Sequence, residues 1–353
     1  MKRLLLALAA AVLLLPGAAE GAACSPLDCA PSQFSLAHGT LLGFRSGTDK
    51  PVTVVDLQTG RPKWVLPAGI TGRDLLVHQA GAKLVWYDAA SGARLYEAAL
   101  PSVEYSLVGV SQDGTRAFAL DNTGPSTRAT IVSRDKTQTI TLPFARGTWE
   151  FDALRGNHLF LIQLLPIGGY EVRLYHLDTG HLDRQPLKDP HDSGRIWGSP
   201  FSRLSSPDGR YLFTLYLGSN GGAMIHELDL KAATARCIDL PGTGDYNAAT
   251  SWGLALSSNG RTLHLVSPGY GRVVAIDVRT RKVTDAFRIA LPNWVVVSTT
   301  ASLSPDGTKL AIANGEAVAV IDLAARKVAL RAAAKKTIAV GYSPDGSTLW
   351  KLS

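Results

Sequence analysis

Five aromatic residues recur at similar intervals along the chain and could together form one binding surface. Trp149, Trp197, Trp252 and Trp294 follow one another at nearly regular spacing, and Tyr105 stands at the matching place one interval earlier. Tryptophan offers a large apolar face and one N–H donor, which suits sugar rings, peptide side chains and flat ligands. Two interpretations are open: the rings face a ligand, or they wedge into a core between repeating units.

Polar residues that could carry chemistry gather in two irregular segments, 188–200 and 241–250. His191, Asp192 and Arg195 lie close together in the first segment, and Tyr246 lies in the second. An adjacent His–Asp pair can orient a base or hold a metal, although solvated loops show the same pattern. The eight histidines show no metal-ligand spacing, and no Gly-x-Ser-x-Gly motif occurs. The sequence therefore predicts binding residues, with no catalytic set, no metal and no cofactor.

A repeated turn indicates the elements that must position these residues. Ser-Pro-Asp-Gly occurs at 206–209, 304–307 and 343–346, each time before a short apolar run, and weaker copies begin at 111 and 257. Proline presets φ to about −65°, aspartate accepts hydrogen bonds from nearby backbone N–H groups, and glycine adopts a positive φ. We therefore interpret Asp208, Asp306 and Asp345 as turn-capping residues rather than as a catalytic carboxylate pair.

A second repeated motif is an apolar strand that ends in Asp and leads into another turn. Its copies end at positions 56, 88, 133, 178, 229, 277 and 322, with Ser in place of Asp at 133. Except for the first, the intervals between successive copies are all similar in length. Their period, near 45, together with four short strands per unit, is typical of a β-propeller blade.

These repeats resemble those of the bacterial YVTN-type and WD-repeat-like propeller superfamily. The best match is Ser304 to Val328, which reads SPDGTKLAIANGEAVAVIDLAARKV, and the resemblance extends over roughly residues 34–353. The chain departs from true WD repeats because it lacks their Trp-Asp dipeptide. The resemblance implies the architecture and says little about function, since the shared residues form turns. Because related propellers include lactonases, lyases and quinoprotein dehydrogenase subunits, it also keeps an enzymatic function open.

We therefore predict one all-β domain over residues 34–353, a seven-bladed propeller of four-stranded antiparallel blades. The turn at Asp345–Gly346 opens strands that no later strand follows, so N- and C-terminal strands are expected to close the ring by sharing a blade. An eighth blade is the alternative. Residues 324–334 favour a helix by propensity, yet the repeat places a strand there, and propensity is a weak prior.

Within a blade we name the strands A to D from the centre of the ring outward. The A–B and C–D turns share one face of the ring, the turn face, and the B–C and D–A connections share the other, the loop face. The irregular segments and the five aromatic residues all fall on the loop face. Variable loops on a rigid scaffold are the usual place for binding, so function is expected there.

Residues 1–23 are predicted to be a secretory signal peptide. Lys2 and Arg3 precede the apolar run from Leu4 to Leu15, which is too short to span a bilayer. Residues 24–33 form a leader in which Cys24 and Cys29 are expected to form a disulfide in an oxidising compartment, leaving Cys237 unpaired. The alternative is that Cys24 becomes a lipid-anchored first residue.

Composition narrows the possible partners. The net charge of +7 comes from scattered basic residues on a chain that is predicted to be exported, so a nucleic-acid partner is not expected. We predict a monomeric secreted or periplasmic protein that acts as a binding or scaffold protein in the cell envelope. Its partner is an unidentified protein, small molecule or carbohydrate. A propeller enzyme using His191, Asp192 and Arg195 is the alternative.

Overall fold

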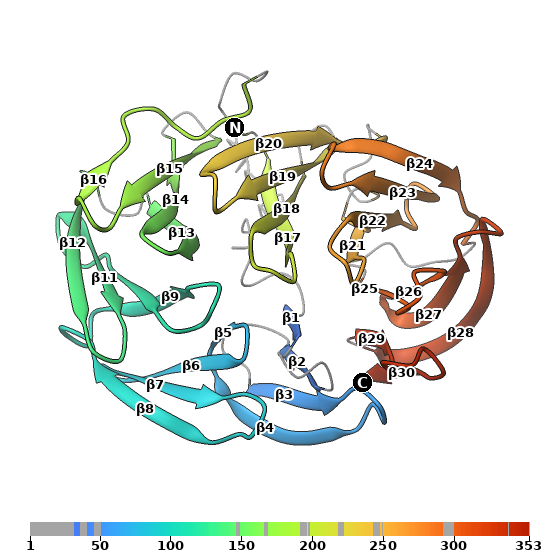
Figure 1. Ribbon diagram of the computed structural model, residues 1–353, viewed down its shortest axis with the longest axis horizontal. Coiled ribbons are helices and arrows are strands. Elements are labelled where there is room, and N and C mark those ends of the chain that lie inside the picture. Colours follow the sequence, from blue (N-terminus) through green and yellow to red (C-terminus); the bar gives the residue numbers. More distant parts are fainter. Residues whose placement is uncertain are drawn as a thin grey trace, which may run out of the picture.

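The computed structural model describes residues 32–35, 41–45, 51–145, 149–165, 169–190, 196, 198–217, 222–242, 248, 250–291, 300–337 and 339–352. Its strands β1 to β30 pair in antiparallel sheets that stand around a centre, as Figure 1 shows. The signal peptide, Cys24 and Cys29 lie outside the described residues, so these remain predictions.

Six consecutive blades run around the ring from residue 70 to residue 337, and in each the four strands follow one another from the inner to the outer edge. Blade 1 comprises β5 (Ile70–Gly72), β6 (Leu75–Ala80), β7 (Lys83–Asp88) and β8 (Arg94–Ala99), and blade 2 comprises β9 (Ser106–Val110), β10 (Ala117–Asp121), β11 (Ser126–Val132) and β12 (Thr137–Ala145). Blade 3 comprises β13 (Trp149–Arg155), β14 (His158–Leu164), β15 (Tyr170–His176) and β16 (His181–Leu182), and blade 4 comprises β17 (Ser199–Ser205), β18 (Tyr211–Leu217), β19 (Ala223–Asp229) and β20 (Thr234–Asp239). Blade 5 comprises β21 (Gly253–Leu256), β22 (Thr262–Ser267), β23 (Arg272–Asp277) and β24 (Lys282–Arg288), and blade 6 comprises β25 (Thr300–Leu303), β26 (Lys309–Ala313), β27 (Gly315–Asp322) and β28 (Lys327–Thr337).

Strands from the N- and C-terminal parts of the described chain meet at the seventh position of the ring. The N-terminal strands β3 (Pro51–Asp56) and β4 (Pro62–Ala68) form its outer part, and the C-terminal hairpin of β29 (Ala339–Tyr342) and β30 (Leu349–Leu352) continues the series of inner strands after β25. Trp350 packs with Val55 and Ala339 and lies directly beneath Gly60 of the β3–β4 turn. The predicted seven-bladed propeller, closed by strands from both ends of the chain, is confirmed.

The closure differs from the prediction in one respect. Two further strands, β1 (Ser32–Ser35) and β2 (Leu41–Arg45), pair with the inner edge of β3 in the order β1-β2-β3-β4. The C-terminal hairpin therefore packs against β3 through side chains and forms its hydrogen-bonded ladder only within itself. Because no third strand pairs with this hairpin, the turn at Asp345–Gly346 is compatible, in the sequence alone, with the start of an eighth blade.

The turn chemistry is as the sequence predicts. In the turn at 304–307 the Ser304 hydroxyl donates to Asp306 Oδ1 (2.6 Å), the Thr308 N–H donates to the same oxygen (3.0 Å), and Gly307 has a φ of 73°. Asp208 and Asp345 accept the corresponding bonds in their own turns. The segment with helical propensity forms the outer strand β28, because pairing with β27 outweighs a preference of a few tenths of a kcal/mol per residue.

Ion pairs add to the apolar contacts between neighbouring blades. Arg281, in the β23–β24 turn of blade 5, donates to Glu227 of blade 4 (2.8 Å), and Arg326, in the β27–β28 turn of blade 6, donates to Asp285 of blade 5 (2.9 Å). Both arginines have a positive φ, 60° and 53°, which non-glycine residues rarely adopt. The two turns thus direct a long cationic side chain back to the preceding blade.

The closure predicts an energetic coupling between residues 55 and 350. Trp350→Ala removes a side chain that is 5% exposed and should lower the free energy of unfolding by about 3–5 kcal/mol. Combined with Val55→Ala in a double-mutant cycle followed by urea denaturation, it should show an interaction energy of at least about 0.5 kcal/mol. Val65→Ala, at a position 62% exposed on the adjacent β4, is the control and should change stability by less than about 0.5 kcal/mol. Strict additivity of the first two substitutions would contradict this closure.

Candidate functional site

The structure places three of the predicted aromatic residues between blades. Tyr105 and Trp149 are 2% exposed and Trp252 is 1% exposed, and they pack in the cores between blades 1 and 2, blades 2 and 3, and blades 4 and 5. This is the second of the two interpretations given above, so burial weighs against these rings as a ligand surface, and their role in binding stays a prediction. The other predicted site residues lie outside the described residues: Trp197, Trp294, His191, Asp192, Arg195 and Tyr246.

A group of polar side chains is buried between blades 3 and 4, beside the apolar residues of the same interface. We call Asp152, Tyr170, Arg203, Tyr216 and His226 the inter-blade polar cluster. Arg203 forms an ion pair with the Asp152 carboxylate and also donates to the Asp152 backbone carbonyl (2.8 Å). The rings of Tyr170 and Tyr216 lie 5.1 Å apart, and His226 meets Tyr216 edge-on at 5.9 Å.

Strand register explains how these residues come together. Arg203 on β17 lies opposite Thr214 on β18, Thr214 lies opposite His226 on β19, and His226 lies opposite Cys237 on β20. Directly opposite residues of antiparallel strands project from the same face, so this row points toward blade 3. There, Asp152 lies at a bulge in β13, and bulges re-aim side chains.

Several buried polar atoms of the cluster have no hydrogen-bond partner in the described part of the chain. They are Asp152 Oδ2, Arg203 Nε and the hydroxyl groups of Tyr170 and Tyr216. An unsatisfied buried donor or acceptor costs about 1–3 kcal/mol, and native proteins leave few of them. Among the described residues, the cluster therefore keeps hydrogen-bonding capacity that no neighbouring group takes up.

Burial sets the protonation states in the cluster. It lowers the pKa of His226 from 6.5 to about 4, so the imidazole is neutral at neutral pH, although the Asp152 carboxylate partly opposes the shift. Burial also raises the pKa of Tyr216, with Asp152 adding to the effect, and raises that of Tyr170 well above its ordinary value, with the neighbouring Tyr216 contributing. Both phenols thus stay protonated, and the one ion pair in the cluster is close to neutral overall.

The end of the inter-blade polar cluster that contains Tyr170 and Tyr216 adjoins the loop face. Tyr170 begins β15 and Tyr216 is the last but one residue of β18, next to connections of blades 3 and 4. Ile196 exchanges two backbone hydrogen bonds with Tyr170, both of 3.0 Å. Ile196 belongs to the segment that contains His191, Asp192, Arg195 and Trp197, so the chain leads from the predicted site to the cluster within a few residues.

Sequence reasoning missed the cluster, although one signal was present. Asp152 and Arg203 interrupt inner strands at Phe151-Asp152-Ala153 and Ser202-Arg203-Leu204. Charged residues are almost never fully buried unless they are paired. Two opposite charges at corresponding places in adjacent inner strands could have indicated a buried pair.

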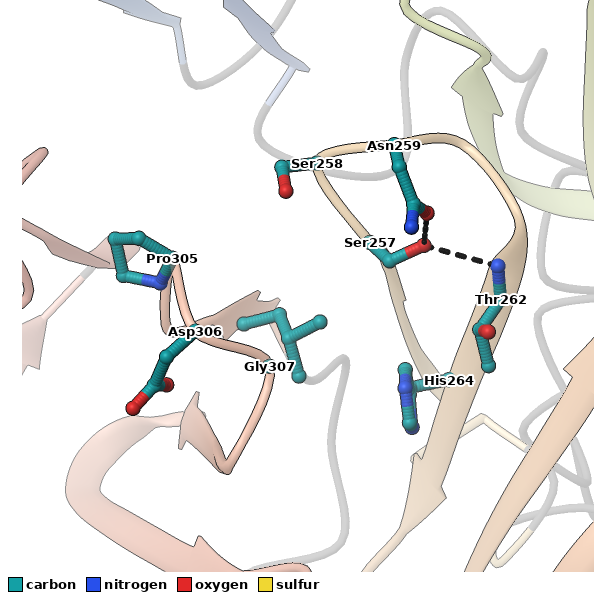
Figure 2. Close-up of a pocket in the computed structure, with 9 residues that line it drawn as sticks. Ser257, Ser258, Asn259, Thr262, His264, Pro305, Asp306 and Gly307 are labelled. Carbon is teal, nitrogen blue, oxygen red and sulfur yellow. Dashed lines mark hydrogen bonds between the residues drawn. The ribbon is translucent and has the colours of Figure 1, made fainter.

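A pocket of about 260 Å³ opens on the turn face, between blades 5 and 6 (Figure 2). It lies between the turns that begin at Ser257 and Ser304, and His264 of β22 forms one wall. His264 Nδ1 is buried without a hydrogen-bond partner among the described residues, and burial lowers the pKa of this histidine. From the sequence, these turns are expected only to connect strands A and B.

Among the described residues, no group of three or more His, Cys, Asp and Glu side chains is arranged to hold a metal ion. No helix in the same part of the chain has the length and apolar character needed to cross a membrane.

The fold is that of a β-propeller, and solved structures share it at low sequence identity. Hydrazine synthase from Kuenenia stuttgartiensis aligns with a TM-score of 0.50 and 16% identity, over 86% of this chain and 99% of that chain. The dihydro-heme d1 dehydrogenase NirN, in complex with DHE, aligns with a TM-score of 0.54 and 15% identity, over 90% and 68%. Apo AztD from Citrobacter koseri aligns with a TM-score of 0.55 and 12% identity, over 86% of each chain.

Identities this low establish a common fold and carry nothing about activity. No family model matches the sequence, and no curated protein matches it. The protein is thus a β-propeller by its structure, while its resemblance to YVTN-type repeats stays a prediction.

The neutral state of His226 predicts a pH dependence of stability. The unfolded chain binds a proton on this residue near pH 6.5, whereas the folded protein binds it only near 4, so the free energy of unfolding falls as the pH falls between these values. The loss should reach about 2 kcal/mol between about pH 7 and about pH 5.

Urea denaturation of the wild type and of His226→Gln at both pH values isolates this contribution, because the other titrating groups are common to the two proteins. The loss of stability on acidification should be smaller by this amount in His226→Gln. Equal losses in the two proteins would show that His226 is not buried in a neutral state.

Proposed function

We propose that the protein is an exported propeller that binds a small polar ligand at the loop-face end of the inter-blade polar cluster. In this proposal it acts as a binding or scaffold protein in the cell envelope. One observation carries the proposal: four buried polar atoms, contributed by strands of two adjacent blades, have no partner in the geometry of the described residues and belong to a cluster that adjoins the segment the sequence singles out for binding.

The chemistry of these atoms defines the ligand. Two phenol hydroxyls can donate or accept, Asp152 Oδ2 accepts, and Arg203 Nε donates. The Asp152–Arg203 ion pair carries no net charge, and His226 is neutral. A ligand that carries both donors and acceptors and little net charge therefore fits best. The strands fix the geometry in advance, which reduces the entropy lost on binding.

An enzyme is the second candidate function. Hydrazine synthase and the dehydrogenase NirN are enzymes that share the fold. In this chain the raised pKa of Tyr170 and of Tyr216 suits both phenols to donating hydrogen bonds and not to accepting a proton at neutral pH. A catalytic base would then have to come from the loop with His191 and Asp192.

The binding proposal is tested with the ligand that co-purifies from the native envelope fraction, identified by mass spectrometry of the denatured complex. Tyr170→Phe and Tyr216→Phe should each weaken its binding about tenfold, which corresponds to one lost hydrogen bond of about 1.4 kcal/mol. Each substitution should change the melting temperature little and to the same extent, because among the described residues the two hydroxyls have no hydrogen-bond partner except each other.

Tyr211→Phe is the matched control. Tyr211 lies on the same strand β18 but packs toward blade 5, so its substitution should leave affinity unchanged. If Tyr170→Phe and Tyr216→Phe bind the ligand as well as the wild type does, the cluster is not the site. If only a protein co-purifies, the scaffold role is supported and the small-ligand role is wrong.

Export predicts the mass of the mature chain. Cleavage after Ala19, Gly21 or Ala23 would remove the signal peptide, and a disulfide between Cys24 and Cys29 would lower the mass by about two hydrogens. Intact-mass spectrometry of the protein from the envelope fraction distinguishes these forms from one with a lipid on Cys24. A full-length, unprocessed mass would contradict export.

A further inference from the structure

The A–B turns contact one another from blade to blade around the turn face. A Cβ atom placed on Gly260 of blade 5 would lie 3.4 Å from Cδ of Pro207 in blade 4. One placed on Gly346 of the closing hairpin would lie 3.5 Å from Cδ of Pro305 in blade 6. At these junctions the proline ring of one turn therefore covers the glycine of the next.

The junction between blades 5 and 6 lacks this contact. The turn of blade 5 reads Ser257-Ser258-Asn259-Gly260, so Ser258 stands where the neighbouring turns have proline and Asn259 where they have aspartate. A Cβ placed on Gly307 would meet no atom within 4 Å. The pocket of about 260 Å³ in Figure 2 opens at this place, because a small side chain has replaced a ring.

The walls of the pocket combine hydrogen-bonding groups with an apolar surface. The Ser257 hydroxyl is already engaged, since it donates to Asn259 Oδ1 (2.8 Å) and accepts from the Thr262 N–H (2.9 Å). This leaves the Asn259 amide nitrogen and the Ser258 hydroxyl for a ligand, and the imidazole ring of His264 forms one wall. Leu303 and Pro305 supply the apolar side.

The charges around the pocket favour a neutral ligand. Among the described residues that line it there is no lysine or arginine, and Asp306 contributes a carboxylate. Its bonds with Ser304 and Thr308 lower the pKa of Asp306, so this charge persists to acidic pH. Asp285 acts on His264 from the same blade, and its partner Arg326 lies in blade 6. An anion would therefore meet negative charge and no compensating cation in the pocket wall.

We propose that this pocket is a second binding site, distinct from the inter-blade polar cluster and on the opposite face of the ring, for a neutral polyhydroxylated ligand of about one sugar ring. Hydroxyl groups of such a ligand match the amide, hydroxyl and imidazole groups, and its C–H face matches Leu303 and Pro305. A ring of about 12 non-hydrogen atoms should bind with a Kd of about 1 mM.

The test uses the full mature protein and two probes, D-glucose and N-acetyl-D-glucosamine, with saturation-transfer-difference NMR titrations to about 10 mM, well above the expected Kd. Ser258→Pro restores the residue of the neighbouring turns, fills the pocket and should weaken binding at least tenfold. Its melting temperature should not fall, since the equivalent turns already contain proline.

Asn259→Asp is the second variant. Its aspartate can accept the same hydrogen bonds within the turn that Asp306 accepts in the turn of blade 6. The substitution removes an N–H donor, adds a negative charge and should weaken probe binding about tenfold. His158→Ala, at a half-buried histidine on β14 outside the pocket, is the control and should bind as the wild type does. Tyr216→Phe should also leave probe binding unchanged, which separates this site from the proposed function.

Two results would overturn the proposal. One is that the wild type binds neither probe over the whole titration. The other is that Ser258→Pro and Asn259→Asp, both folded by their melting curves, bind a probe as tightly as the wild type does.

Discussion

Burial of both faces of each sheet is the constraint on which the ring depends. Alternate residues of β18 enter two different cores: Leu212 and Tyr216 pack toward blade 3, whereas Phe213 and Leu215 pack toward blade 5. A sheet with two apolar faces needs a neighbour on each side, and only a closed ring provides one for every blade. The arginines at positive φ, Arg281 and Arg326, add a charged contact at two of these junctions.

The same constraint explains where polar chemistry can arise. A polar residue on an inner strand has no solvent-exposed face to turn to, so it must find its partner on the adjacent blade, as Arg203 does with Asp152. Where the partners are incomplete, hydrogen-bonding capacity remains, as in the cluster between blades 3 and 4. On the turn face the presence of Ser258 where the neighbouring turns have proline has a comparable effect, since it leaves an open space beside the His264 ring.

The sequence predicted what depends on local chemistry. The turn at Ser304–Gly307, the strand over the alanine-rich segment and the order of strands within a blade all follow from turn residues and their period. It did not predict what depends on contacts between blades. Asp152 and Arg203 lie far apart in the chain, and the bulge that aims Asp152 leaves no local signal. The burial of Trp149 was one of the two interpretations that the sequence left open. The pairing of β1 and β2 with β3, which leaves the C-terminal hairpin paired only within itself, is likewise a long-range feature, and so the sequence left the blade count open between seven and eight.

The long sequence separation between β3 and the closing hairpin has a consequence for biosynthesis. Val55 and Trp350 lie far apart in the sequence, so the contact between them can form only after the closing hairpin of β29 and β30 has been synthesised. Until then, β3 exposes the apolar side chain of Val55, which Trp350 later covers. The six blades that lie between β4 and β29 in the sequence can already pack against one another. Contacts of such long range form slowly, and open sheet edges promote aggregation. The nascent ring is therefore most vulnerable just before the closing hairpin of β29 and β30 emerges.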